Sequence, residues 1–413
     1  MSEKRIVFKP GFYDDFHCIG SRCRNHCCHD WNVKITKQEF KNIKRHIQSE
    51  ELKNIFAHGF SAQHHTSMQK TRTYQIKQDE YGNCLFLDEK GLCRIHNECG
   101  GAMLAQVCKN FPKRATLYYM QKANYALSLG CEEVVRLLFL QKDGFFIKAC
   151  QQQADKKMVC DIFDDNKAKQ FPSVVYFYDM KMLFLGILQN RQYTLSERMV
   201  LLAMALQKIE KEQHLENIPA FVNHFLNNMN QAEYQKMYRD FFKKVKKDSK
   251  VNIQHMMAYL DILSNHKGTW GQIWEEIMPQ KSNHNKTQHD KNKAMDIDKA
   301  AYENAKKEFE QYLQKNPHFL ENIMVSVAWY NEYPYISGFS LWESYCLFAV
   351  VYSIYHFVLT LYCQKQKTQE QIIDCIVVLS RILTHSRQVW EKMYEIFKQN
   401  NTLAHMAVWL LWF

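Results

Sequence analysis

The first third of the chain concentrates its cysteines, and this feature constrains the fold more than any other. The chain has 413 residues and 14 cysteines, and nine of these cysteines lie between Cys18 and Cys131. Four of the nine fall within one short segment, Cys18–Cys28. No apolar periodicity runs through that segment, so burial in a hydrophobic core explains it poorly. Thiols spaced this closely predict either metal ligands or disulfides.

The start of the chain bears on the choice between these two chemistries. The charged stretch Met1–Arg5 precedes only Ile6–Phe8, which is far shorter than the apolar region of a secretory signal peptide. We therefore expect a cytoplasmic protein, and the reducing cytoplasm disfavours structural disulfides. Clustered cysteines in that compartment favour metal binding.

The spacing of the cysteines predicts a thiolate site but does not identify its metal. Zinc sites use ligand pairs separated by roughly two to four residues, which fits Cys23 and Cys27 but not the wider interval between Cys84 and Cys93. The spacing over Cys18–Cys27 approaches that of plant-type ferredoxins without matching it. Thiolates suit zinc and iron–sulfur clusters equally, so both stay open.

Local patterns predict a small α+β arrangement around the thiols. Thr36 and Glu39 form a capping-box pattern that predicts the start of a helix. Alternation over Thr73–Ile76 predicts a short strand.

Two cysteines are expected to share one face of a hairpin. The segments Cys84–Leu87 and Leu92–Ile95 flank a four-residue loop and predict paired strands. This register pairs Phe86 with Cys93, and alternation then places Cys84 on the same face as Cys93. Both thiols would be close enough to bind one metal centre.

A further hairpin is expected over residues 115–120 and 124–129, followed by a helix that begins at Cys131. A thiol in the first helical turn lies near the positive end of the helix dipole. We therefore predict a lowered pKa for Cys131, which Glu132 and Glu133 partly oppose.

The remainder of the chain predicts a helical body. Only 13 Gly and 7 Pro occur, and this scarcity favours long helices over strands and turns. Residues 173–265 have helical periodicity, and the apolar run 346–363 approaches membrane-spanning length. Because polar residues such as Tyr352 and His356 interrupt that run, we expect a core helix instead.

These patterns predict a mainly α fold, in which a helical body carries a small cysteine-rich α+β N-terminal metal-binding domain. Residues 279–298 are polar and charged without apolar periodicity, which indicates a linker or insertion. The predicted divisions are a cysteine-rich metal domain at 1–140, a helical domain at 141–278, the linker at 279–298 and a C-terminal helical domain at 299–413.

The net charge of +11 permits attraction to nucleic acid, acidic proteins or membranes without selecting among them. The densest basic run, Lys243–Lys247, is typical of a solvated helix end. It is accompanied by no RNA-binding signature and no finger built from two cysteines and two histidines. We predict no nucleic-acid partner and no membrane partner, and we keep a nucleic-acid-binding metalloprotein as a rival hypothesis.

Several motifs together resemble the cysteine-cluster proteins described as zinc- or iron-chelating domains. They are the segment Cys18–Cys28, the pair Cys84 and Cys93, and the segment Val107–Pro112. With Ser128–Leu138 added, the sequence resembles the flagellin lysine-N-methylases more narrowly. The segment Phe319–Asn331 also fits that family, so the resemblance spans most of the chain.

The resemblance implies transfer of a methyl group from S-adenosylmethionine to the ε-amines of flagellin lysines. It also implies a [4Fe–4S] cluster bound by the cysteines, with zinc as the alternative. One such cluster needs about four thiolates, so some candidates must have other roles. The metal-ligand candidates carried over are Cys18, Cys23, Cys27, Cys28, Cys84, Cys93, Cys108 and Cys131.

The residues themselves do not reveal where S-adenosylmethionine binds or which group takes the proton of the amine. Gly100 and Gly101 lack the spacing and the preceding strand of a nucleotide-binding fingerprint. One hypothesis places a proton-accepting pocket in an aromatic and polar segment. Its members are Tyr330, Asn331, Glu332, Tyr333 and Tyr335. A non-enzymatic zinc- or iron-chelating or metal-sensing protein is the main alternative, since it would use the same cysteines without turnover.

Overall fold

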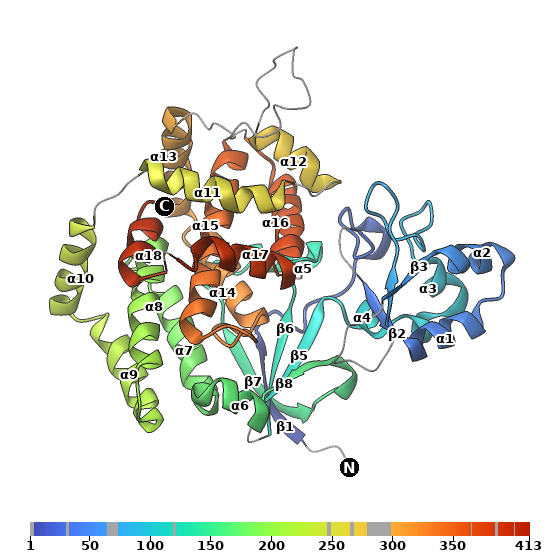
Figure 1. Cartoon of the computed structure of the whole chain (residues 1–413), viewed down its shortest axis with the longest axis horizontal. Coiled ribbons are helices and arrows are strands. Elements are labelled where there is room, and N and C mark those ends of the chain that lie inside the picture. Colours follow the sequence, from blue (N-terminus) through green and yellow to red (C-terminus); the bar gives the residue numbers. More distant parts are fainter. Residues whose placement is uncertain are drawn as a thin grey trace.

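The protein is mainly helical, with a small head beside a larger body (Figure 1). The computed structural model describes residues 4–29, 33–63, 73–118, 121–245, 249–264, 268–278, 299–364, 366–384, 387–399 and 401–413. All strands of the described residues lie before residue 163. The predicted mainly α fold, with a small sheet region near the N-terminus, is confirmed. The predicted linker at 279–298 lies outside the described residues.

The head has a hydrophobic core of its own, in which Ile35, Ile43, Phe56 and Phe86 are buried. A three-stranded antiparallel sheet contributes β2 (Lys34–Thr36), β4 (Thr73–Ile76) and β3 (Phe60–Gln63), in that order. The helices are α1 (Lys37–His46), α2 (Glu50–His58), α3 (Arg94–Cys99) and α4 (Gln106–Asn110). The predicted capping box before α1 is confirmed, with reciprocal hydrogen bonds between Thr36 and Glu39.

The predicted hairpin over residues 84–95 is wrong. Within the described residues these two segments are joined by a single isolated bridge, between Leu87 and Cys93, one residue away from the predicted pairing. Asp88 causes the change, because its side chain accepts a hydrogen bond from the backbone N–H of Leu92 at 2.8 Å and closes a tight turn. Cys93 then precedes α3 directly instead of continuing a strand.

A five-stranded mixed sheet connects the head to the body. Its order is β7 (Ile147–Gln153), β1 (Lys4–Pro10), β6 (Lys122–Leu127), β5 (Lys113–Tyr118) and β8 (Val159–Ile162). The predicted hairpin at 115–120 and 124–129 is confirmed as the antiparallel pair β5–β6, with both strands starting two residues earlier. Because β1 pairs with β7, the sheet joins residues from both sides of position 140. The domain divisions themselves stay predictions.

The body consists of helices, as the periodicity over 173–265 and beyond predicts. The first group is α5 (Glu132–Phe139), α6 (Asp165–Gln170), α7 (Phe177–Leu188), α8 (Leu195–Glu210), α9 (Ile218–Asn228), α10 (Ala232–Lys244), α11 (Ser249–Leu263) and α12 (Thr269–Ile277). The second group is α13 (Lys299–Lys315), α14 (His318–Tyr330), α15 (Leu341–Cys363), α16 (Gln369–Thr384), α17 (Arg387–Phe397) and α18 (Leu403–Leu410).

Helix α15 forms the centre of the body. It is long and apolar enough to cross a membrane, yet 89% of its most apolar window is buried inside the protein. Helices α8, α13, α16 and α17 pack against it. Its hydroxyl groups find partners within the core, since Tyr352 bonds Ser196 at 2.7 Å and Tyr355 bonds Ser380 at 2.6 Å. The prediction of a core helix is therefore confirmed.

His356 is a buried titratable group on α15. Burial, with a smaller contribution from Lys306, lowers the pKa of His356 from 6.5 to about 3. The unfolded chain therefore binds a proton below pH 6.5 that the folded chain does not bind. Stability from the neutral imidazole is present above that pH and is lost as the pH falls.

We expect His356→Phe to make the protein less sensitive to acid. In the wild type, this group should lower the free energy of unfolding by about 1.4 kcal/mol per pH unit below its ordinary pKa. Urea unfolding between neutral and mildly acidic pH measures this slope. His214→Gln, at an exposed histidine, is the matched control and should leave the slope unchanged. Equal slopes for wild type and His356→Phe would contradict the prediction.

Candidate functional site

Seven of the eight predicted ligands come together between the head and the body. The Cys27 thiol is the centre of the group and acts electrostatically on its neighbours. Those neighbours are Cys28, Cys84, Cys93, Cys108 and Cys131. Cys23 adjoins Cys131. Cys84, Cys93 and Cys108 border the hydrophobic core of the head, whereas Cys131 borders the core of the body.

Cys18 and Cys99 are not among the neighbours given above. Cys18, the remaining predicted ligand, is exposed. Cys99, which the family pattern did not include, points its thiol at the backbone carbonyl of His46, 3.5 Å away. All fourteen cysteines are among the described residues, and none is in a disulfide.

Burial dominates the acidity of most of these thiols. It raises the pKa of Cys84 to about 11 and the pKa of Cys131 to about 12. The predicted lowering of the Cys131 pKa is therefore wrong, although α5 does begin directly after it. Backbone N–H groups at the start of α5 lower that pKa, but burial outweighs them. Cys27 is the exception, because its hydrogen bond with Cys28 lowers the Cys27 pKa below the ordinary value of a thiol.

The donor chemistry of this group fits a thiolate-bound metal or cluster. Thiolates contributed by separate segments are the usual ligands of iron–sulfur clusters and of structural zinc. As the side chains stand, no three Cys, His, Asp or Glu residues of the described chain are arranged to hold a metal ion. The metal site therefore stays a prediction, with the thiols around Cys27 as its candidate ligands.

A buried carboxylate fastens the cysteine loop to the body. Glu132, the first residue of α5, is fully buried. It accepts hydrogen bonds from the backbone N–H groups of Arg24 at 2.8 Å and Asn25 at 3.0 Å. Arg136 of the same helix binds its other oxygen at 2.7 Å. Because Glu132 follows Cys131, this interaction joins the loop to the helix that begins beside a candidate ligand.

Helix α16 holds the same loop through Arg381. This buried guanidinium donates to the backbone carbonyls of Asn25 at 2.6 Å, Gly130 at 2.9 Å and His29 at 3.1 Å. On the same helix, Asp374 forms an ion pair with Arg24 at 2.8 Å. The loop is therefore positioned by the body rather than by the head alone.

We expect Arg381→Met to loosen the cysteine loop while the helical body stays folded. The change removes the hydrogen-bond donor of these backbone carbonyls. The free energy that protects the loop amides from exchange should therefore fall by about 2 kcal/mol. Hydrogen exchange over residues 20–29 measures that protection. Arg387→Met on α17 removes an exposed ion pair and should change loop protection by less than about 0.5 kcal/mol. Equal protection in both variants would contradict the prediction.

The second candidate site is a polar face of the five-stranded sheet. Alternation along β5 places Arg114, Thr116 and Tyr118 on one face, and Asn124 of β6 pairs with Thr116. A covered sheet face is ordinarily apolar. Here Thr116 and Asn124 are both buried, and they lie under Glu332 from the turn after α14.

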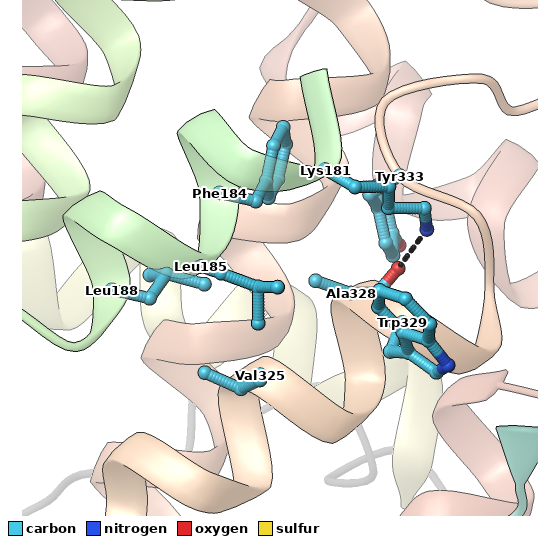
Figure 2. A pocket seen from close by; sticks show the side chains of 8 residues that line it. All are labelled: Lys181, Phe184, Leu185, Leu188, Val325, Ala328, Trp329 and Tyr333. Carbon is cyan, nitrogen blue, oxygen red and sulfur yellow. Dashed lines mark hydrogen bonds between the residues drawn. The ribbon is translucent and has the colours of Figure 1, made fainter. Parts of the chain in front are cut away.

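Glu332 is the centre of this polar cluster. One carboxylate oxygen accepts a hydrogen bond from Asn124 Nδ2 at 2.7 Å, and the other lies 2.8 Å from Lys181 Nζ. Lys181 also donates to the Ala328 carbonyl at 3.3 Å, the contact drawn in Figure 2. The φ angle of Glu332 is +59°, a left-handed conformation that is uncommon outside glycine. Strain of this kind persists where the surroundings hold it, and it is frequent at functional sites.

The electrostatics of the cluster follow from burial. Burial lowers the pKa of Lys181, while the Glu332 carboxylate opposes that shift. Burial, and then the same carboxylate, raises the pKa of Tyr118, so its hydroxyl stays protonated. The Arg114 guanidinium lies over the Tyr330 ring at 5.5 Å. Two cations and one carboxylate therefore share a site from which water is largely excluded.

Five buried polar atoms of the cluster have no hydrogen-bond partner within the described residues. They are Arg114 Nε, Thr116 Oγ1, Tyr118 Oη, Asn124 Oδ1 and Glu332 Oε2, the last of which is ion-paired with Lys181. Buried polar atoms are almost always paired, so this group is unusual for a covered sheet face. An adjoining cavity lined by Lys181, Trp329 and Tyr333 has a volume of about 10 Å³, which is room for about one water.

The hypothesis of a proton-accepting pocket in the segment 330–335 stays a prediction. Glu332 and Tyr330 lie at the cluster, whereas the Tyr335 hydroxyl donates to the Ser173 carbonyl at 3.1 Å and serves packing. The sequence did carry a signal, namely polar residues at alternate positions of a strand in a largely buried hairpin. The residues that sequence reasoning missed are Arg114, Thr116, Asn124 and Lys181.

The fold and the two sites define a class of protein: a helical body, with a buried polar cluster at its sheet, that holds a cysteine-rich head. The family model described as the FliB lysine N-methylase C-terminal domain matches residues 181–409, more than half of the chain. The chain belongs to the FliB lysine N-methylase family. The matched region includes both Lys181 and Glu332.

Curated relatives agree with this assignment. The chain is 30% identical over 170 residues to the Lysine-N-methylases of Salmonella choleraesuis and Salmonella typhimurium, covering 40% of this chain and 39% of each relative. It is 31% identical over 141 residues to the Flagellar biosynthetic protein FliU of Salmonella muenchen, covering 33% of this chain and 79% of that protein. The matched part thus spans about two fifths of the length of the two methylases. No solved structure matches the chain.

Proposed function

We propose that this chain is a cytoplasmic protein-lysine N-methyltransferase that uses S-adenosylmethionine and modifies lysines of flagellin. The names of the relatives support lysine methylation and a link to the flagellum. The burial of α15 inside the body supports a protein that works away from membranes. Because two of the relatives are matched over only part of their length, the activity, the methyl donor and the substrate all belong to this proposal.

The burial of Glu332 beside Lys181 is the observation that supports this chemistry most directly. In methyl transfer the bond from carbon to sulfur breaks as the bond from carbon to nitrogen forms, and the sulfonium becomes a thioether. A lysine amine attacks only when it is neutral, so its proton must pass to an acceptor. Glu332 is buried within the family-matched region and already holds one ammonium group, that of Lys181, at 2.8 Å. A carboxylate with these contacts fits the role of proton acceptor.

We expect Glu332→Gln to abolish most of the methyl transfer. Loss of a proton acceptor should lower kcat by about 100-fold or more. The assay follows S-adenosylmethionine-dependent methylation of purified flagellin. Glu321→Gln is the matched control, since Glu321 is another buried carboxylate on α14 and binds Arg198 at 2.7 Å and Arg191 at 2.9 Å. Both variants lose a buried ion pair, so an equal loss of rate in the two would contradict a special role for Glu332.

The cysteine group is proposed to hold a [4Fe–4S] cluster with Cys27, Cys84, Cys93 and Cys108 as ligands, because the last three border the core of the head and have Cys27 as a neighbour. A cluster of this kind supplies an electron-transfer centre and crosslinks the segments that bind it. The chain's own contribution is to hold the Cys27 loop against the head and the body, through Glu132 and Arg381.

We expect protein purified without oxygen to contain about four iron and four sulfide per chain. Cys93→Ser should lose most of this content, whereas Cys99→Ser, at a cysteine that is not among these neighbours, should retain it. Metal and sulfide analysis with an absorption spectrum measures both. Stoichiometric zinc without sulfide would contradict the cluster. Bound metal in a wild-type protein that never methylates flagellin would favour the non-enzymatic chelating or metal-sensing alternative.

A further inference from the structure

The head carries an open groove that neither of the sites above uses. It lies between α1, α2 and one face of the β3–β4 pair, and its volume is about 620 Å³. The described residues that line it include four aromatic rings and two lysines, namely Phe40, Phe56, Phe60, Tyr74, Lys44 and Lys53. We name this hollow the head groove.

We propose that the head groove docks a helical segment of the protein substrate, with apolar side chains on one face of that helix and carboxylates beside them. This inference rests on the proposed function, because it assigns a docking surface to the protein that is methylated. The head groove lies outside the family-matched region 181–409, so it adds residues that the family model does not cover.

The floor of the head groove is an aromatic cluster that the head leaves partly uncovered. Phe40 stacks on Tyr74 with ring centroids 4.0 Å apart, and Phe60 meets Phe40 edge-on at 5.0 Å. Phe56 contacts both phenylalanines at 4.8 Å and is buried, whereas the other three rings are only partly buried. Apolar surface gathered in a hollow gains free energy when a second apolar surface covers it. The floor therefore fits apolar side chains of a partner.

The walls of the head groove suit a helix rather than an extended strand. Its two sides are helices, and its strands contribute a face, because Ala62 and Tyr74 are a cross-strand pair whose side chains share that face. Such a groove accepts an amphipathic helix, whose apolar side chains recur every three or four residues and reach the floor together. Figure 1 shows α1 and α2 in the part of the head that lies away from the body, where a second protein can approach.

The charges at the rim select the partner. Both charged residues among the described lining are lysines, Lys44 on α1 and Lys53 on α2, and both are exposed. Lys53 lies 2.7 Å from the Glu50 carboxylate, but an exposed pair of this kind contributes little and can exchange its partner. A helix with carboxylates on both flanks of its apolar face would meet one lysine on each wall. A helix with lysines in those places would be repelled.

Docking in the head groove would change the affinity for the substrate and not the chemical step. The aromatic rings of the groove belong to the core of the head or pack against it, whereas Lys181 and Glu332 lie in the body. A contact made equally in the bound substrate and in the transition state changes KM and leaves kcat as it is. The head groove thus predicts an effect on KM, where Glu332 predicts one on kcat.

The first test uses a defined probe on the full chain. The probe is a fluorescein-labelled peptide that forms an amphipathic helix, with leucines on one face and glutamates on both flanks. Fluorescence anisotropy should show binding in the micromolar range, weakened at least about 10-fold when lysines replace the glutamates. Absence of binding, or equal binding of the two peptides, would overturn the proposal.

Ala57→Trp closes the head groove without removing a core contact. Ala57 is an exposed lining residue of α2, and the indole would occupy the space above the rings. This variant should bind the glutamate peptide about 10-fold more weakly. Asn54→Trp is the matched control, since Asn54 is exposed on the same helix but lies outside the lining. Unchanged binding in Ala57→Trp, or an equal loss in Asn54→Trp, would overturn the docking site.

Lys44→Glu tests the charge of the rim. It should weaken binding of the glutamate peptide about 5-fold and strengthen binding of the lysine peptide, because an attraction becomes a repulsion. Lys41→Glu is the matched control, since it reverses the same charge on the same helix outside the lining. Equal effects of the two variants would contradict the selection of carboxylates by the groove.

Kinetics with flagellin keep this inference separate from the proposed function. The glutamate peptide should compete with flagellin, and Ala57→Trp should raise the KM for flagellin about 10-fold at unchanged kcat. Methylation by Ala57→Trp with the wild-type KM would overturn the substrate as the occupant and leave the methylase standing. A wild-type protein that binds flagellin through the head groove but transfers no methyl group would support the docking site and overturn the methylase.

Discussion

The buried Glu132 carboxylate is the contact on which the arrangement of this protein depends. A charge without solvent exposure is tolerated only when it is fully paired, and Glu132 is paired by two backbone N–H groups of the cysteine loop and by Arg136. If the loop that carries Cys23, Cys27 and Cys28 left the body, Glu132 would lose these two N–H donors and keep only Arg136 of its own helix. Arg381 adds three bonds to carbonyls on and beside the same loop. Together these contacts bring thiols of the head within reach of Cys131.

The β5–β6 hairpin connects the two candidate sites. Asn124 of β6 belongs to the polar cluster. Ser128, the residue after the end of β6, is four residues further along, about 13 Å in an extended strand. Cys131 and Glu132 follow at once. The helical body is thus fixed to the cysteine group and to the polar cluster through one continuous segment. Glu132, which positions the loop, directly follows this segment, and Asn124 within the segment binds Glu332, the group proposed to accept a proton.

Much of this organisation could be predicted from the sequence, because it depends on local signals. The helix start after Thr36 follows from its capping box, and the core helix predicted over 346–363 follows from its apolar length with scattered hydroxyls. Two predictions are wrong because of contacts that form only in the folded chain. The Asp88 side chain closes a tight turn where a hairpin was predicted. Burial raises the pKa of Cys131, which was predicted to be lowered. The polar cluster could not be assembled from sequence, since residues 114, 124, 181 and 332 meet only through the fold.

The measurement that tests the account most directly is the fate of the methyl group. Flagellin would be incubated with the purified chain and S-adenosylmethionine carrying a deuterium-labelled methyl group, and its peptides mapped by mass spectrometry. We predict that the wild-type protein transfers the label to lysine ε-amines of flagellin. With the Glu332→Gln variant, these lysines should stay nearly unlabelled. Unlabelled lysines with a metal-loaded, folded wild-type protein would contradict it, and so would equal labelling by the Glu332→Gln variant.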